Sequence, residues 1–115
     1  MEIPRQLLVQ ANKEYWTRGV VHPNKSKPRI AITCEGAVVG FYTPHRAATG
    51  EMRIGPVWVM PEYRRRGLVS AVYASIEGPA LAWVENGNEA CERMLMSCGF
   101  ARHRKYNAGW IWRRP

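Results

Sequence analysis

The chain has 115 residues, the size of one domain, and 46% of them are hydrophobic while 23% are charged. This composition is typical of a globular protein and excludes a disordered one. The longest apolar runs, such as residues 37–42, are too short to cross a bilayer, and the first residues lack the apolar stretch of an export signal. We therefore expect one soluble, cytoplasmic domain over residues 1–115, without a membrane partner.

The balance of charge is strongly basic. Seventeen Lys and Arg residues oppose nine acidic residues, all of them Glu, so the formal net charge is +8. The cations are mostly Arg, which favours planar contacts to phosphate or carboxylate, and they cluster at residues 64–66 and 102–114. This charge can be a solvated surface, or it can serve an anionic partner: a phosphorylated cofactor, an acidic protein or a nucleic acid.

The cysteines and histidines do not form a recognisable motif. Cys34, Cys91 and Cys98 are odd in number, which argues against a disulfide framework. No Cys-x-x-Cys pair occurs and the three histidines are scattered, so we expect no metal site.

Apolar periodicity and turn residues predict an alternation of helices and strands. The predicted elements are, in chain order, a helix over residues 5–17, a loop over 19–28, strands over 29–34 and 37–43, a loop over 44–50, an extended run over 51–60, a helix from 68 that stops at 78–79, a strand over 80–85, a helix from Asn88 to Gly99, and strands over 100–106 and 110–113. This order predicts an α/β protein with a mixed sheet.

The most informative feature is the polar loop of residues 61–67, which lies between an extended run and a helix. Amides in the first turn of a helix have no internal acceptor, and the helix dipole places partial positive charge there. Gly67 allows close approach of the backbone, and Arg64, Arg65 and Arg66 add charge. The loop therefore predicts a phosphate-binding site, although neither common nucleotide fingerprint is present.

Two blocks of sequence resemble the GCN5-related N-acetyltransferase (GNAT) superfamily. Residues 57–69 read VWVMPEYRRRGLV, similar to the family's strand, Pro-Glu-Tyr-Arg, Gln/Arg-x-x-Gly-x-Gly/Ala and helix, with Val69 in place of the final Gly or Ala. Residues 88–100 read NEACERMLMSCGF, similar to the family's Asn-x-x-Ala-x-x-Leu-Tyr-x-x-x-Gly-Phe. The blocks occur in the family's order and spacing, and the resemblance covers about residues 51–106.

The resemblance implies a fold and a cofactor. The implied fold is a single α/β domain with a mixed, mostly antiparallel sheet flanked by helices and a shortened N-terminal region. The implied cofactor is acetyl-CoA: the amides of residues 65–70 would hold its pyrophosphate, and the strand backbone at Val57 and Val59 its pantetheine arm. The cofactor-binding residues implied in this way are Val57, Trp58, Val59, Arg64, Arg65, Arg66, Gly67, Leu68, Val69, Ser70 and Asn88.

The resemblance also implies transfer of an acetyl group to a primary amine. Leu95 occupies the position where the family often has a Tyr that protonates the leaving thiolate, so Tyr106, Tyr73 or Cys34 is a candidate replacement. Glu51 and Glu35 are candidate general bases, with a solvated turn carboxylate as the alternative reading for each.

The acceptor is the open part of the functional hypothesis. The short N-terminal region implies an open acceptor site that suits a lysine of an acidic protein, with Arg102, Arg104 and Arg113 guiding that acceptor from the face opposite Trp110 and Trp112. A homodimer partner could instead complete the pocket. The alternative function is a catalytically weak protein of the same fold that binds an acidic protein or, less favoured, a nucleic acid.

Overall fold

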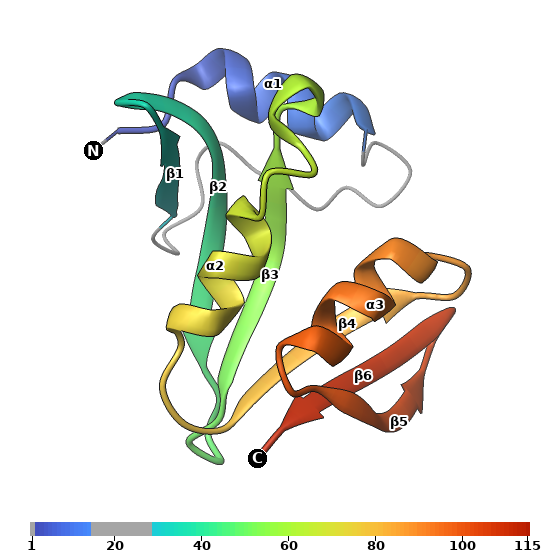
Figure 1. Ribbon diagram of the computed structural model, residues 1–115. Helices are drawn as coiled ribbons and strands as arrows, with labels where there is room; N and C mark the ends of the chain where they lie inside the picture. The colour runs from blue at the N-terminus through green and yellow to red at the C-terminus, as the bar shows by residue number, and fades with distance from the viewer. Residues whose placement is uncertain (1, 15–28) are drawn as a thin grey trace. The chain divides into compact units, whose positions relative to one another are not determined.

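The computed structural model describes residues 2–14 and 29–115. Its elements follow the expected order: α1 (Arg5–Glu14), β1 (Ile30–Cys34), β2 (Ala37–Arg46), β3 (Met52–Val59), a single 3-10 turn η1 (Pro61–Tyr63), α2 (Leu68–Ser75), β4 (Ala80–Glu85), α3 (Glu89–Ser97), β5 (Ala101–Tyr106) and β6 (Gly109–Arg114) (Figure 1). Hydrogen bonds link the described strands in the order β1-β2-β3-β4-β6-β5. The pair β3–β4 is parallel and the pairs β1–β2, β4–β6 and β5–β6 are antiparallel, so the expected mixed, mostly antiparallel α/β sheet is confirmed.

Most element bounds lie within a few residues of the prediction, and the largest difference is in strand β2. The end predicted for the first helix, residues 15–17, lies outside the described residues. Strand β2 continues to Arg46, through Pro44, where we predicted a loop. Pro44 lies beyond the last pair between β1 and β2, Ile30 with Tyr42, so its missing N–H removes no hydrogen bond from that ladder.

Contacts within the chain divide it into two compact units. The first, here called the N-terminal unit, comprises residues 1–44 and 56–66, and the second, the C-terminal unit, comprises residues 45–55 and 67–115. The boundary passes through strand β3 and through the loop before α2.

The N-terminal unit packs one face of α1 against two aromatic strand residues. Leu7, Leu8 and Ala11 recur at helical spacing and are buried with Phe41 and Trp58. The ring centroids of Phe41 and Trp58 are 6.1 Å apart. Gly40 is required here because a Cβ atom at its position would lie 2.2 Å from the carbonyl oxygen of Trp58. The unit therefore has its own small core around the strand that carries the predicted site residues.

The C-terminal unit is a sheet covered by two helices. Strand β3 pairs in parallel with β4 from Met52 with Ala80 to Ile54 with Ala82, and α2 provides the crossover between the two strands. Strands β4, β6 and β5 continue as an antiparallel ladder. Helix α3 lies in front of β4 and β6 in Figure 1, and its Leu95 is fully buried.

The end of β6 is held to the end of α2 by one side chain. The guanidinium of Arg114 donates to the carbonyls of Tyr73 (2.9 Å), Gly78 (3.0 Å) and Ile76, and it lies 5.3 Å from the centre of the Phe100 ring. These carbonyls are at and just beyond the last turn of α2, where a helix lacks internal donors. No helix among the described residues is long and apolar enough to cross a membrane.

Candidate functional site

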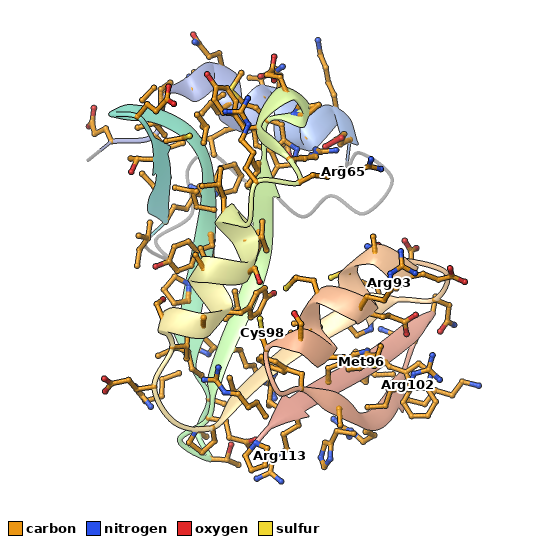
Figure 2. The ribbon with its side chains drawn as sticks, in the orientation of Figure 1. Arg65, Arg93, Met96, Cys98, Arg102 and Arg113 are labelled. Atoms are coloured by element: carbon orange, nitrogen blue, oxygen red, sulfur yellow. The ribbon has the colours of Figure 1, made fainter. Side chains whose placement is uncertain are left out.

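The arginine loop lies in the N-terminal unit, directly after η1. Arg65 adopts a left-handed backbone conformation, with φ of +64°, and its side chain is exposed (Figure 2). The guanidinium of Arg66 lies 4.9 Å from the centre of the Tyr63 ring and makes a long contact, 3.5 Å, to the carbonyl of Glu62. Both arginines keep donors that can meet an anion in solvent.

Arg64 is held differently, by a glutamate fifty positions earlier in the chain. Its Nε donates to the carbonyl of Val59 at 2.9 Å, and its terminal nitrogen donates to the Glu14 carboxylate at 2.8 Å. The indole N–H of Trp58 donates to the same carboxylate at 2.5 Å. The Arg64 hydrogen bond, with help from Trp58, lowers the pKa of Glu14 against the opposing effect of partial burial. Arg64 therefore joins α1 to the end of β3, and a phosphate would compete with Glu14 for it.

Glu14 was not singled out from the sequence, although a signal was present. It follows Ala11 by three positions and Leu7 by seven, so it lies on the apolar stripe of α1. A carboxylate in line with the apolar residues of a helix lies near the packed face, where Trp58 and Arg64 supply hydrogen bonds to it.

The predicted anion-binding helix start lies in the C-terminal unit. Gly67 is the N-cap of α2 with φ of +75°, a conformation that glycine adopts without strain, and a Cβ atom there would meet nothing within 4 Å. The first intrahelical bond runs from the amide of Ala71 to the carbonyl of Gly67. The amides of residues 68–70 thus precede this bond and have no intrahelical acceptor. Leu68 and Val69 are half-buried.

Ser70 faces helix α3. Its hydroxyl lies 3.6 Å from the sulfur of Cys98, and that thiol also approaches the Ser70 carbonyl at 3.7 Å. Cys98 is the C-cap of α3 (Figure 2). Ser70 is one of the implied cofactor-binding residues, and a cofactor contact of its hydroxyl would require this group to turn from the Cys98 thiol.

The predicted pantetheine strand belongs to the core of the N-terminal unit. Trp58 and Val59 are buried and Val57 is half-buried. These residues follow the stretch of β3 that pairs with β4, which ends at Ile54.

Asn88 caps α3. Its side-chain oxygen accepts a hydrogen bond from the amide of Cys91 at 3.3 Å, and Glu89 and Glu92 lie in the first turn, where the helix dipole favours acids. This cap uses the side-chain oxygen of Asn88 and leaves its amide nitrogen for another partner.

The two candidate catalytic residues lie in the C-terminal unit. Glu51 accepts from Arg113 at 2.9 Å and from Thr49 at 3.1 Å. The Arg113 hydrogen bond is the main cause that lowers the pKa of Glu51, so this carboxylate is a weak base as it stands. Tyr106 ends β5 and is 51% exposed, with the Arg104 guanidinium 5.8 Å from its ring centre.

A shallow cavity of about 340 Å³ opens between α3 and the β5–β6 hairpin. It is lined by Glu92, Met96, Phe100, Ala101, Arg102 and Trp112, none of which we predicted as a cofactor ligand. Arg102 pairs with Glu92 at 2.9 Å and lies over the rings of Trp110 and Trp112. The expectation that Arg102 projects away from the tryptophans is therefore wrong. Its cation–π contacts with both rings and its pair with Glu92 hold the Arg102 side chain on the same face as the tryptophans. Residues 2–14 and 29–115 contain no cluster of three or more His, Cys or Glu side chains that could hold a metal ion.

The fold and the loop together define a class of protein. A strand that runs through an arginine-rich loop into a helix, followed by a parallel strand and an antiparallel hairpin, is the arrangement that the resemblance to N-acetyltransferases implied. The model of the acetyltransferase (GNAT) family matches residues 6–100, and the chain belongs to this family. Among curated proteins, none matches the chain in sequence.

Solved structures share the fold at low sequence identity. A GNAT family acetyltransferase from Elizabethkingia anophelis with acetyl-CoA bound has a TM-score of 0.68 and 14% identity, over 99% of this chain and 91% of that one. PaiA N-acetyltransferase from Thermoplasma acidophilum in complex with coenzyme A has a TM-score of 0.64 and 11% identity, over 99% and 80%. PH1933 from Pyrococcus horikoshii has a TM-score of 0.57 and 14% identity over 71% of this chain, which spans 60% of its length.

Proposed function

We propose that the protein transfers an acetyl group from acetyl-CoA to a primary amine. The observation that carries this proposal is the start of α2, where the amides of residues 68–70 have no intrahelical acceptor and directly follow three arginines in the chain. Two of the similar structures hold acetyl-CoA or coenzyme A, which supports the same cofactor here.

The residues present fit a pyrophosphate. The left-handed backbone at Gly67 turns the chain into α2, and Arg65 and Arg66 supply exposed cations. We assign the main charge contact to Arg66, because Arg64 is already paired with Glu14. Bound acetyl-CoA would supply an activated acetyl thioester. The residues of the chain would bind and orient the cofactor and the acceptor amine, and would accept and donate protons.

The proposed reaction needs one group that accepts a proton and one that donates a proton. The attacking amine must lose a proton, and we propose that Glu51 accepts it only when Arg113 releases the carboxylate. Tyr106, whose side chain is half exposed, is the proposed proton donor for the leaving group. For the acceptor we propose a lysine of an acidic protein, because the net charge of +8 attracts such a partner. The free cysteines Cys34, Cys91 and Cys98 are consistent with action in the reducing cytoplasm.

A second candidate function is supported by Leu95, which is fully buried where the family often has a tyrosine. A catalytically weak member of the family that binds an acidic protein or a nucleic acid through its basic surface would fit this residue. The two functions differ in product and not in cofactor affinity, so one experiment separates them.

The test is calorimetric titration of the full chain with coenzyme A, followed by mass spectrometry of lysine peptides incubated with acetyl-CoA. Arg66→Ala should weaken coenzyme A binding about tenfold, since a charge-assisted hydrogen bond contributes roughly 1.5 kcal/mol. Arg93→Ala is the matched control, because Arg93 is an exposed arginine on α3 that pairs only loosely, at 3.8 Å, with Glu89. Absence of coenzyme A binding would reject the proposal, and binding without any acetylated product would favour the second function.

A further inference from the structure

One face of the sheet in the C-terminal unit carries aromatic and basic side chains that the proposed cofactor site does not include. Trp112 and its cross-strand partner Ala82 face α3, since Trp112 lines the cavity with Met96 of that helix. Because side chains alternate along a strand, their neighbours point to the opposite side of the sheet, which we call the outer face. By the observed register, the outer face carries Arg53, Leu81, Trp83, Glu85, Arg104, Tyr106, Ile111 and Arg113.

Trp83 is held flat on the outer face. Its indole N–H donates to the carbonyl of Tyr106 at 3.0 Å, which fixes the edge of the ring. A Cβ atom on Gly109 would lie 2.9 Å from Cε2 and Cζ2 of this indole, so the ring rests directly on the glycine. The side chain is nonetheless 42% exposed, although it is a large aromatic residue. One side of the indole therefore contacts the sheet and the other is presented to solvent in a fixed orientation.

The outer face also carries cations. Tyr106 follows on the same face, 51% exposed, with the guanidinium of Arg104 5.8 Å from its ring centre. Arg53 is exposed beside Leu81, and Arg113 lies at the far end of β6 (Figure 2), where it pairs with Glu51. Glu85 is half-buried and has interactions of its own. The exposed charge of Arg53 and Arg104 on the outer face is thus positive, on a face that also carries the rings of Trp83 and Tyr106.

We propose that the outer face binds single-stranded nucleic acid, with a base stacked on Trp83 and phosphates on Arg53 and Arg104. Exposed aromatic rings accept bases of any sequence, and nearby arginines follow the backbone of the strand. A second copy of the chain is disfavoured as occupant, because it would bring these arginines against one another. An acidic peptide would pair with the arginines, but its carboxylates offer no flat ring that could stack on the fixed indole of Trp83. The inference is argued from observations other than those behind the acetyl transfer proposed above, although Tyr106 and Arg113 of this face also enter that proposal.

The structure also offers a purely internal role for Trp83, since an aromatic ring that covers a strand glycine stabilises a sheet. Binding therefore has to be measured directly. The probe is a fluorescein-labelled 12-mer of deoxythymidine, titrated with the full chain at several salt concentrations and followed by anisotropy. We expect binding that weakens with salt, because each phosphate contact on a single strand contributes a slope of about −0.7 in log K against log salt.

Trp83→Leu should weaken binding of the 12-mer about tenfold, whereas Trp83→Phe should retain most of it, because phenylalanine can still stack. Arg104→Ala should reduce the salt slope by about 0.7, and the matched control Arg93→Ala, which removes the same charge from α3, should change it by less. Should Trp83→Leu fail to fold, as judged by its circular dichroism, Arg53→Ala with Arg104→Ala replaces it, since both side chains are exposed.

Three outcomes would overturn the proposal. The first is no binding of the 12-mer at low salt. The second is an equal loss of affinity for the 12-mer in Arg104→Ala and Arg93→Ala, together with unchanged affinity in Trp83→Leu. This result would show that the oligonucleotide is attracted by net charge alone. The third is a poly-glutamate peptide that competes as well as unlabelled oligonucleotide, which would assign the outer face to acidic proteins.

Discussion

At the scale of single residues, the site depends on pairs that bring distant positions together. Glu14, at the end of α1, receives hydrogen bonds from Trp58 of β3 and Arg64 of the loop. Because Arg64 also donates to the carbonyl of Val59, its side chain orients the loop in which Arg65 and Arg66 lie. We therefore regard Glu14 and Arg64 as positioning residues for the proposed pyrophosphate site.

Removing the negative charge of Glu14 should destabilise the fold in a pH-dependent way. The pKa of Glu14 is lowered in the folded protein from its ordinary value of 4.5. Its stabilising effect is therefore fully present above about pH 4.5 and is lost as the pH falls through the lowered folded-state pKa. Since Arg64 and Glu14 are 43% and 40% exposed, solvent screens the pair, and Glu14→Gln should cost only about 0.5–1 kcal/mol at pH 7.

Urea unfolding of the wild type and Glu14→Gln from pH 3 to pH 7 would measure this difference. Glu89→Gln is the control, because its pair with Arg93 is long and more than two-thirds exposed. A Glu14 effect that stays constant down to pH 3 would contradict the assignment, since it could not then come from the charge.

At the scale of elements, helix α3 shows how a motif position can change its role. Asn88 caps the helix and Cys98 ends it against Ser70 of α2. Between them, Leu95 is fully buried, and its carbonyl accepts from the amides of Phe100 and Cys98. The side chain at this position therefore packs the C-terminal unit, and a proton donor has to come from elsewhere in the chain.

Leu95→Tyr should consequently destabilise the protein without accelerating acetyl transfer. The larger ring must displace its neighbours, which costs about 1–3 kcal/mol, and its hydroxyl would need a buried partner. Met96→Tyr, one residue along and 55% exposed, should change stability by less than about 0.5 kcal/mol. Denaturant midpoints together with acetylation rates test this, and a stable Leu95→Tyr enzyme with a higher rate would show that the tyrosine reaches the reacting atoms.

At the scale of the whole molecule, cofactor binding should stabilise the folded chain. The amides of residues 68–70 are arranged as a helix start only when α2 is formed. A ligand that binds these amides binds the folded protein and not the unfolded chain, so its binding energy adds to the stability of the fold.

Coenzyme A at a hundred times its dissociation constant should therefore raise the free energy of unfolding by about 2.7 kcal/mol. Thermal and urea unfolding with and without the cofactor would measure this, with inorganic phosphate at the same concentration as the control. Arg66→Ala should need about tenfold more coenzyme A for the same gain, since it loses one charge-assisted hydrogen bond. An equal gain from inorganic phosphate would mean that a general anion effect, and not the cofactor, stabilises the fold.

The sequence by itself determined the order of helices and strands, the family and the existence of a basic loop before a helix. These features depend on neighbours in the chain: apolar spacing along α1, the turn at Glu35 and Gly36, the cap at Asn88, and the conformation that Gly67 allows. Such signals act over a few residues, so a sequence displays them directly.

The tertiary structure alone decided which of those residues are available for chemistry. Arg64 is occupied by Glu14, Ser70 faces Cys98, Glu51 is paired with Arg113, and Trp83 lies flat on Gly109. Each of these contacts joins residues that are 26 to 62 positions apart. Local propensity carries no information on such pairs, because packing of strands and helices from separate parts of the chain creates them.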